Sequence, residues 1–449
     1  MKKWIFIFLM FRIISCFAGE VALNAELYGI NSNREEIARW LYSGKNGLIE
    51  KSNEKNGAII GLKGNYVGIE AGLKAKCSNE ESIKLKEIYV EKDWANYTVY
   101  AGKKSYLFSN PKSELSTGSL LVSNNAEAPP VLYLGTKGYI PLKWSGNKVL
   151  ISASMANGIL EKERVCESPY LHEKELYLKL KLNQKNSFYG GISHAALWGG
   201  EVNGKKINSG FSDFISVLLV NNTGDNVIVN EATNKIGDHK AIYEIGYEKS
   251  GENADAVFYC QHFFEDGSGK KFKNWKDMLL GINIIPKREG VISEVLMEYI
   301  YTKDQSGLGV HNVSGGNDYY YDNYIYGPWT YKDMIIGNSL FITEGSGKDI
   351  KIVHSRISGI NIGIRGKLGK EWSYTGRFTA TQNFGTCNDA GKEIFDKGKK
   401  EYYTILQLEK AEPFGIKESS AYMAIARDTG EIYNNTGVII GFKKNINIY

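Results

Sequence analysis

The stretch from Val67 to Lys76 reads VGIEAGLKAK, in which apolar residues alternate with glycine or charged residues. Successive side chains of a β-strand point to opposite faces, so this stretch has one apolar face and one polar face. A length of about ten residues suits a strand that crosses a membrane at a tilt. The stretch therefore predicts an amphipathic strand, with Leu73 on the apolar face and Lys74 and Lys76 on the charged face.

The same alternation recurs along the chain. It is clearest at residues 176–182, 241–247, 291–302, 360–365 and 440–448, and less regular strands are predicted at residues 214–220, 257–264 and 421–427. Such strands build either a soluble β-sandwich, whose apolar faces meet in a core, or a membrane barrel, whose apolar faces meet lipid. Alternation alone leaves both architectures open.

Three features favour the membrane barrel. Lys, Glu and Arg recur on the polar faces from about residue 21 to the end of the chain, as a hydrated lumen requires. The chain also ends inside a predicted strand, at the aromatic Tyr449, as the closing strands of outer-membrane barrels do. Finally, aromatic residues concentrate near predicted strand ends, where a membrane-interface belt would hold them: Tyr89, Trp94, Tyr97, Tyr100, Trp372 and Tyr374. We therefore predict an all-β fold, a transmembrane antiparallel β-barrel in the cell outer membrane of a Gram-negative bacterium.

The first residues predict an export signal. Lys2 and Lys3 precede an apolar stretch that extends to Phe17, and cleavage after Ala18 would remove residues 1–18. The alternative is a lipid-modified Cys16. Beyond this segment no run of about 18 apolar residues occurs, so a membrane role requires a barrel, and we expect residues 19–449 to form it as one domain.

Charge and reactive residues exclude several functions. The net charge of +5 is dispersed rather than clustered, so nucleic acid is not expected as a partner. The cysteines and histidines show neither zinc-binding spacing nor a nucleophile motif. Disulfides among Cys77, Cys166, Cys260 and Cys387 remain open, because the sequence cannot assign their pairing. We predict no catalytic residues, no metal site and no cofactor.

A short helix is predicted near the N-terminus. Ser32 and Glu35 have the spacing of a capping box, and Ile37, Trp40 and Leu41 follow at helical spacing. We expect a helix over residues 33–42 that plugs or flanks the barrel.

The segment 317–329 combines aromatic rings with carboxylates and amides. Rings stack on the apolar faces of sugars while Asp and Asn bind hydroxyl groups, so the segment predicts a polysaccharide-binding site. The candidate residues are Asp318, Tyr319, Tyr320, Tyr321, Asp322, Tyr324, Tyr326 and Trp329. An interface girdle with a hydrated loop explains the same residues. Glycoside hydrolysis by Asp318 and Asp322 would need a set separation of the two carboxylates, which the sequence does not give.

The order of short motifs resembles the capsule assembly Wzi family of outer-membrane barrels. The motifs lie at residues 26–29, 40–47, 100–104, 115–120, 125–126, 129–131, 191–200, 263–269, 324–331 and 336–340. The sequence departs from the family pattern at residues 327–329 and 338–339. The resemblance implies a barrel of about 18 strands, within the range of bacterial outer-membrane barrels. It also implies a role in assembling or attaching capsular or related surface polysaccharide.

Two functional hypotheses follow. In the first, a non-enzymatic barrel binds surface polysaccharide and assists capsule assembly or attachment, with outer-membrane lipid and the barrel insertion machinery as further partners. In the second, the charged polar faces line a carbohydrate-selective porin or diffusion channel.

Overall fold

The computed structural model describes residues 20–79, 83–105, 113–220, 236–265, 267–288, 290–305, 320–389 and 397–448. The predicted signal peptide with Cys16 and Ala18, and the final residue Tyr449, lie outside these ranges. The barrel strands are β1 (Val21–Ser32), β2 (Asn56–Tyr66), β3 (Ile69–Ser78), β4 (Lys84–Trp94), β5 (Tyr97–Lys103), β6 (Pro130–Thr136), β7 (Ile140–Pro141), β8 (Val149–Ile159), β9 (Tyr170–Lys181), β10 (Asn186–Trp198), β13 (Asp238–Ser250), β14 (Ala254–Phe264), β15 (Met278–Pro286), β16 (Ile292–Tyr301), β21 (Ile357–Leu368), β22 (Trp372–Asn383), β23 (Lys399–Ala411), β24 (Ser419–Gly430) and β25 (Asn434–Ile448).

Smaller elements lie in the connections between these strands. Three short strand pairs are β11 (Glu201–Val202) with β12 (Lys205–Lys206), β17 (Thr330–Tyr331) with β18 (Met334–Ile335), and β19 (Ile342–Glu344) with β20 (Lys351–His354). The helices are α2 (Arg39–Tyr42), α3 (Phe211–Leu219) and α4 (Gly267–Lys270), and the 3-10 turns are η1 (Lys143–Ser145), η2 (Gly347–Asp349), η3 (Cys387–Asp389) and η4 (Pro413–Gly415).

The large sheet closes on itself. Except for β6 and β7, each of its strands pairs antiparallel with the next one along the chain, and β1 pairs with both β2 and β25, so that Val21 lies opposite Ile448. Strands β6 and β7 both pair with β8 and share one place in the ring, which gives 18 strand positions. The predicted all-β barrel of about 18 strands is confirmed.

The period-two pattern assigns the two faces of the wall. On β3 the Lys76 side chain points inward and its residue is only 1% exposed, whereas the outward-facing Val90 of the neighbouring β4 is 55% exposed. Outward positions on the other strands are likewise apolar and exposed, among them Leu178, Ile362 and Ile440. Such a band of apolar side chains suits contact with lipid hydrocarbon.

Tyrosines and glycines interlock on the inner face of the wall. A Cβ atom at Gly57 would collide with the ring of Tyr28, which lies opposite it in the register between β1 and β2. Because the glycine has no side chain, the tyrosine ring lies flat across the neighbouring strand. The same arrangement is found at Tyr89 with Gly72, Tyr177 with Gly191, Tyr189 with Gly246, Tyr259 with Gly281, and Tyr422 with Gly441.

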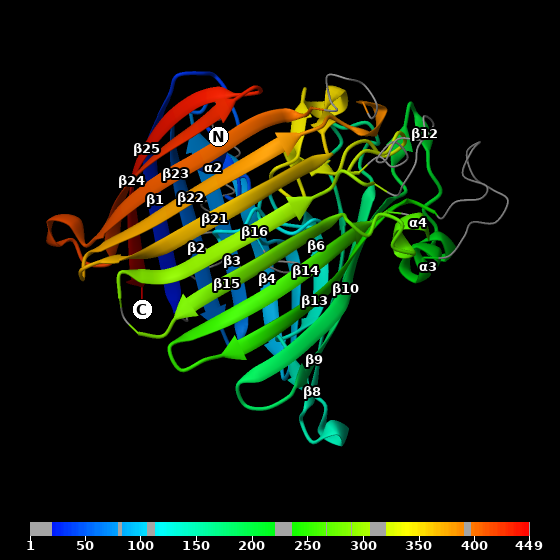
Figure 1. Cartoon of the computed structure of the whole chain (residues 1–449), viewed down its shortest axis with the longest axis horizontal. Coiled ribbons are helices and arrows are strands. Elements are labelled where there is room, and N and C mark those ends of the chain that lie inside the picture. Colours follow the sequence, from blue (N-terminus) through cyan, green and yellow to red (C-terminus); the bar gives the residue numbers. More distant parts are fainter. Residues whose placement is uncertain are drawn as a thin grey trace.

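The two ends of the barrel differ in their connections. Short turns gather at the end where Val21 and Ile448 lie, at the lower left of Figure 1, whereas the long connections with α3, α4 and β12 gather at the opposite end. We call these the short-turn end and the long-connection end. Outer-membrane barrels have short turns on the periplasmic side and longer loops on the outside.

The predicted aromatic belt is confirmed in part. Trp94 and Trp372 are exposed on the outer face near the short-turn end. Tyr89 and Tyr100, predicted for the same belt, instead point into the lumen and are buried, and the Tyr89 hydroxyl donates to Glu70 over 2.6 Å. The prediction used only the position of these residues along the strand. Whether a ring faces lipid or the lumen depends on which of the two alternating faces of the strand the residue occupies.

Two sequence predictions of local structure were wrong. The segment predicted as a strand at residues 214–220 belongs to helix α3, whose side chains Phe214 and Val217 pack with Trp198 on the outer wall. The helix predicted over residues 33–42 covers only its last four residues, because Ser32 still belongs to β1 and Ala38 precedes the helix without a side-chain cap. Within the described residues, no helix is both long and apolar enough to span a membrane.

Candidate functional site

Four connections from the long-connection end fold into the lumen. We call residues 33–55, 113–129, 160–169 and 320–356 the plug. Hydrogen bonds join them to one another: the Ser123 amide donates to the Ile336 carbonyl over 2.8 Å, and the Lys51 ammonium donates to the Thr343 carbonyl over 3.2 Å. Helix α2 belongs to this plug and contacts β23, β24 and β25, so the predicted helix lies inside the barrel.

The plug has an apolar centre. Leu120, Leu121, Trp329 and Leu340 are fully buried there, and the Trp329 indole donates to the Leu121 carbonyl over 2.8 Å. A cavity of about 20 Å³ beside Arg39 has room for about one water molecule. The long-connection half of the lumen is therefore packed like a protein core.

A buried arginine fixes the aromatic segment of the plug. The Arg164 guanidinium donates to the carbonyls of Thr330 over 2.9 Å, Tyr326 over 2.9 Å and Pro328 over 3.1 Å. Since carbonyl oxygens buried without a donor are costly, one side chain satisfies three of them at once. Arg164 thus joins segment 160–169 to segment 320–356.

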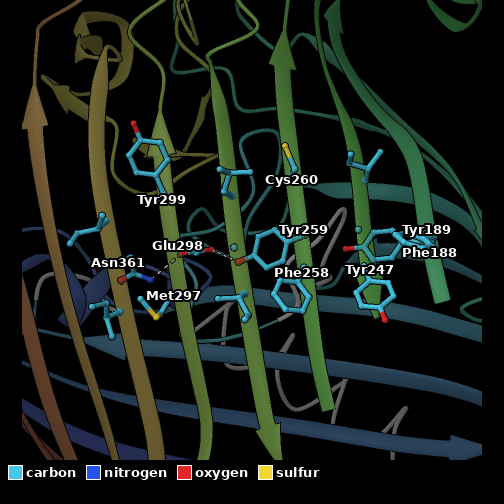
Figure 2. Close-up of a pocket in the computed structure, with 17 residues that line it drawn as sticks. Phe188, Tyr189, Tyr247, Phe258, Tyr259, Cys260, Met297, Glu298, Tyr299 and Asn361 are labelled. Carbon is cyan, nitrogen blue, oxygen red and sulfur yellow. Dashed lines mark hydrogen bonds between the residues drawn. The ribbon is translucent and has the colours of Figure 1, made fainter. Parts of the chain in front are cut away.

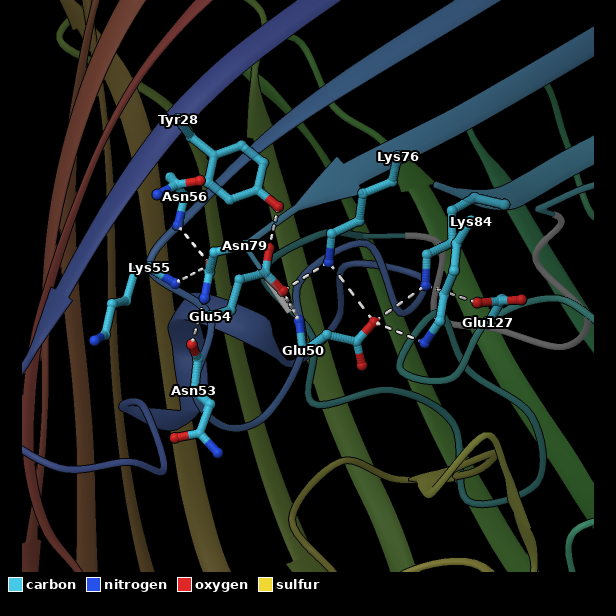
Figure 3. A network of polar contacts seen from close by, with 11 residues as sticks. Tyr28, Glu50, Asn53, Glu54, Lys55, Asn56, Lys76, Asn79, Lys84 and Glu127 are labelled. Carbon is cyan, nitrogen blue, oxygen red and sulfur yellow. Dashed lines mark hydrogen bonds and ion pairs between the residues drawn. The ribbon is translucent and has the colours of Figure 1, made fainter. Parts of the chain in front are cut away.

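Charged pairs attach the plug to the barrel wall (Figure 3). The Lys76 ammonium on β3 lies 2.6 Å from Glu54, whose carboxylate also accepts a hydrogen bond from Tyr28. Lys86 on β4 lies 2.9 Å from Glu127 and 3.3 Å from Glu50.

Neighbouring charges also set the ionisation of this network. Burial alone would raise the pKa of Glu50, but the ammonium groups of Lys86, Lys76 and Lys84 outweigh it and hold this pKa below its usual value. The acceptors come from the plug and the cations from the wall, so the network resists withdrawal of the plug.

A second attachment lies on the other side of the lumen. The Glu298 carboxylate on β16 accepts hydrogen bonds from Ser116 over 2.5 Å and from the Thr117 amide over 2.9 Å, both in the plug. Within the wall it accepts from Tyr259 over 2.8 Å and from Asn361 over 3.0 Å. Four donors satisfy one buried carboxylate, which explains how a charge is tolerated there.

Four of the eight predicted polysaccharide-binding residues are buried in the plug. Tyr320, Tyr321, Tyr326 and Trp329 are at most 1% exposed, so their ring faces are not available to a sugar in this structure. The Tyr320 hydroxyl donates to Asp277 over 2.6 Å, and its ring packs edge-on against Phe263. The predicted residues Asp318 and Tyr319 lie outside the described part of the chain.

The remaining predicted residues lie at the plug surface. Tyr324 is 75% exposed at the tip of a tight loop, while Asp322 and Asn323 are half-buried beside it. The Asn323 side-chain oxygen accepts hydrogen bonds from the amides of Ile325 over 2.9 Å and Tyr326 over 3.0 Å, which holds the loop closed and Tyr324 outward. Local hydrogen bonding thus presents one aromatic ring and one amide to solvent.

Burial sets the ionisation of the nearby carboxyl group. It raises the pKa of Asp322, although the Lys240 ammonium opposes this rise. Lys240 itself is held 2.7 Å from Asp238 and 3.3 Å from Glu265. Asp322 therefore faces a paired cation and is not a lone acid, an arrangement that suits binding of hydroxyl groups.

Further exposed charges lie on other parts of the plug. Lys348 lies 2.5 Å from Glu167, and the Gly347 amide donates to the exposed Asp333 over 2.8 Å. Sequence reasoning missed these residues, as it missed Arg164 and Glu298, because each is an isolated charge without a motif. The loop with the exposed Tyr324 and the half-buried Asp322 and Asn323 is the candidate site, and Asp333 and Lys348 are further exposed charges of the plug.

Reactive side chains are dispersed. Within the described ranges, no three His, Cys, Asp or Glu residues are arranged to hold a metal ion, and no disulfide joins the described cysteines. His172, His194, His239 and His262 lie on the outer face of the wall rather than at the plug surface. His311 lies outside the described residues.

Comparisons with known proteins agree with this architecture. Wzi of Escherichia coli, described as an outer-membrane protein involved in group 1 capsule assembly and a carbohydrate-binding β-barrel, superposes with a TM-score of 0.61 at 10% identity, covering 96% of this chain and 85% of that one. OpdO of Pseudomonas aeruginosa superposes with a TM-score of 0.51 at 10% identity, covering 96% and 97% of the two chains. At these identities the likeness concerns the fold. No curated protein sequence matches the chain significantly.

A family model gives the assignment that sequence identity could not. The model described as capsule assembly protein Wzi matches residues 34–349, a range that includes two segments of the plug completely and most of the other two. The match and the lipid-facing band of the barrel together place the protein in the outer membrane. The chain belongs to the capsule assembly protein Wzi family.

Proposed function

We propose that this protein binds a surface polysaccharide at the exposed surface of its plug and assists the assembly or attachment of a capsule, without catalysing a reaction. The proposal rests on the observation that this barrel of the Wzi family is closed at its long-connection end by a tightly packed plug. The long connections face the outside in barrels of this kind, so the plug surface would meet the polysaccharide. The related E. coli protein is described as carbohydrate-binding, which supports the same role.

The candidate site has the chemistry that sugars need. The Tyr324 ring offers an apolar face for C–H groups, and the side chains of Asn323 and Asp322 offer donors and acceptors for hydroxyls. Lys348 and Asp333 add further exposed charges to the plug. The contribution of Asp318 and Tyr319 stays a prediction.

The alternative of a diffusion channel is less well supported. Wall charges that would line a channel, such as Lys76 and Lys86, are instead paired with Glu54 and Glu127 of the plug. We expect the intact protein to be almost silent in planar-bilayer conductance measurements. A steady conductance comparable to that of an open porin would favour the channel.

Two further parts of the proposal concern assembly. Outer-membrane lipid would cover the exposed apolar band, and the insertion machinery would act on the final strand β25. Export by a signal peptide over residues 1–18 also stays a prediction.

A binding experiment tests the proposal. Capsular polysaccharide isolated from the source strain is titrated into the detergent-solubilised protein, and Tyr324→Ala is expected to weaken binding by about five- to thirtyfold, as loss of a central aromatic contact does. Tyr66→Ala, an exposed tyrosine at the short-turn end, is the matched control and is expected to bind like the wild type. Equal binding by all three proteins would reject this site.

A cellular experiment tests the role in attachment. Deletion of the gene is expected to release polysaccharide into the medium while synthesis continues. Unchanged retention at the cell surface would reject the function.

A further inference from the structure

An apolar groove lies on the lipid-facing side of the wall. It has a volume of about 840 Å³ and spans β13 to β16 and β21, with outward side chains that include Ile245, Cys260, Leu280, Met297 and Ile362 (Figure 2). This volume lies in the range of about 300–1,000 Å³ that holds small ligands. The polar side chains on the same strands, Tyr259, Glu298 and Asn361, point to the lumen, where they are bonded to one another, so they leave the groove side apolar.

A basic and aromatic segment borders the groove at the long-connection end. Residues 270–276, between β14 and β15, expose four lysines and two aromatic rings: Lys270, Lys271, Phe272, Lys273, Trp275 and Lys276. Among the described residues, none of these lysines forms an ion pair with a carboxylate. The segment therefore offers four cationic side chains without an acidic partner there.

Buried polar residues hold this segment in place. The Asn274 side chain donates to the Phe263 carbonyl over 2.9 Å. Asp277 accepts hydrogen bonds from the amides of Asp304 over 2.8 Å and Gln305 over 2.6 Å. Because these two residues are fully buried while the lysines between and before them are exposed, the backbone is fixed and the ammonium groups point outward.

Ring packing aligns the segment with the groove. Phe272 stacks on His262 with ring centroids 4.7 Å apart and on Tyr243 at 5.5 Å. His262 points outward on β14, two residues from Cys260 in the upper row of the groove, a step of about 7 Å. The cationic segment and the apolar groove thus form one continuous surface on the outer wall.

We propose that this surface binds a phosphorylated, multiply acylated lipid of the membrane leaflet at the long-connection end. The ammonium groups pair with phosphate, Trp275 and Phe272 lie at the interface, and the acyl chains occupy the groove. A soluble partner does not suit an apolar groove at hydrocarbon depth. The proposal is independent of polysaccharide binding, because the plug surface contributes no residue to it.

Native mass spectrometry of the full mature protein in a non-ionic detergent tests the proposal. Diphosphorylated lipid A is the probe, and the fully dephosphorylated lipid and inorganic phosphate are the comparison arms. The quadruple variant K270A/K271A/K273A/K276A is expected to bind the probe at least about tenfold more weakly, since each lysine near an anionic surface contributes. The matched control K148A/K181A/K370A/K417A removes four exposed lysines at the short-turn end and is expected to stay within about twofold of the wild type.

A second pair of variants tests the groove. Cys260→Trp narrows it and is expected to weaken binding, whereas Leu132→Trp on another lipid-facing strand is not. Each of these variants changes a single lipid-facing side chain. They therefore test the groove even if the quadruple variant does not form a folded barrel, as judged by its gel mobility before and after heating.

Four results would overturn the proposal. The first is equal binding of the dephosphorylated lipid, and the second is wild-type binding by the folded quadruple variant. The third is competition by inorganic phosphate with no lipid bound. The fourth is a wild-type protein that forms a dimer instead of binding lipid, with Cys260→Trp abolishing this dimer.

Discussion

Two ion pairs of strand β3 lie in different surroundings. Lys76 on β3 pairs with Glu54 where the plug fills the lumen, and both side chains are completely buried. Glu70 on the same strand pairs with Lys63 of β2 nearer the short-turn end, where the side chains are 32% and 52% exposed. Only six residues, or about 20 Å, separate Lys76 from Glu70. The same alternation of apolar and charged residues thus leads to a buried, plug-filled half and a solvent-exposed half of one lumen.

The largest effect is expected from Glu54→Gln. It removes the nearer carboxylate of the buried Lys76 ammonium and leaves only Glu50, at 3.6 Å. We expect this to cost about 3–5 kcal/mol, whereas Glu70→Gln at the exposed pair costs about 1 kcal/mol or less. Urea unfolding of the detergent-solubilised variants measures both. Equal losses of stability would remove the distinction between the two halves.

The next effect concerns pH at the long-connection end. Burial raises the pKa of Asp277 to about 7, and the hydrogen bonds from Tyr320 and two amides oppose that rise. Because the pKa of Asp277 is higher in the folded state than in the unfolded state, protonation of Asp277 favours folding. This contribution to the free energy of unfolding is complete below the unfolded pKa of about 3.9 and is lost as the pH rises to about 7. At about 1.4 kcal/mol for each pH unit, the loss is at most about 4 kcal/mol.

Unfolding midpoints at pH 4.5 and pH 8 check this expectation. Relative to Asp277→Asn, the wild type should be less stable at the higher pH. A constant difference between the two proteins would show that Asp277 is ionised throughout.

A smaller effect is expected from Arg164→Met. It removes the guanidinium donor from the carbonyls of Thr330 and Tyr326, whereas the Pro328 carbonyl keeps the Thr330 amide as a donor. We expect a cost of about 2–3 kcal/mol. The loss should loosen the aromatic segment and increase its cleavage by protease added from outside. Arg34→Met, which changes an exposed arginine of the same plug, is the control, and equal cleavage of both variants would contradict the role of Arg164.

The smallest effect is expected at the plug surface. Lys348→Ala removes an exposed pair with Glu167, and because solvent screens this pair, the variant should unfold at nearly the same urea concentration as the wild type. The same unfolding measurement checks it. A loss as large as that of Glu54→Gln would mean that the plug surface is as tightly coupled as its interior.

The sequence was sufficient for the wall because period two is a local property. Leu73 and Lys76 reveal their faces from their own neighbours, and closure by β25 follows from an amphipathic final segment. The same rule misread residues 214–220, where Phe214 and Val217 serve one face of a helix instead.

The plug could not be predicted in the same way. Arg164 contacts Tyr326 across more than 160 residues, and no local pattern records such a contact. Aromatic residues beside carboxylates look the same whether they face solvent, as Tyr324 does, or a packed interior, as Trp329 does. Sequence reasoning therefore found the segment but not which of its rings are exposed.

The seam between β1 and β25 has a consequence for biogenesis. It joins the two ends of the chain through twelve facing residue pairs, from Val21 with Ile448 to Ser32 with Gly437. A growing chain keeps both of these edges unpaired until its last strand is made. The final step of assembly is therefore also the step that traps the four inner segments, and a chaperone for this protein has two strand edges to shield until then.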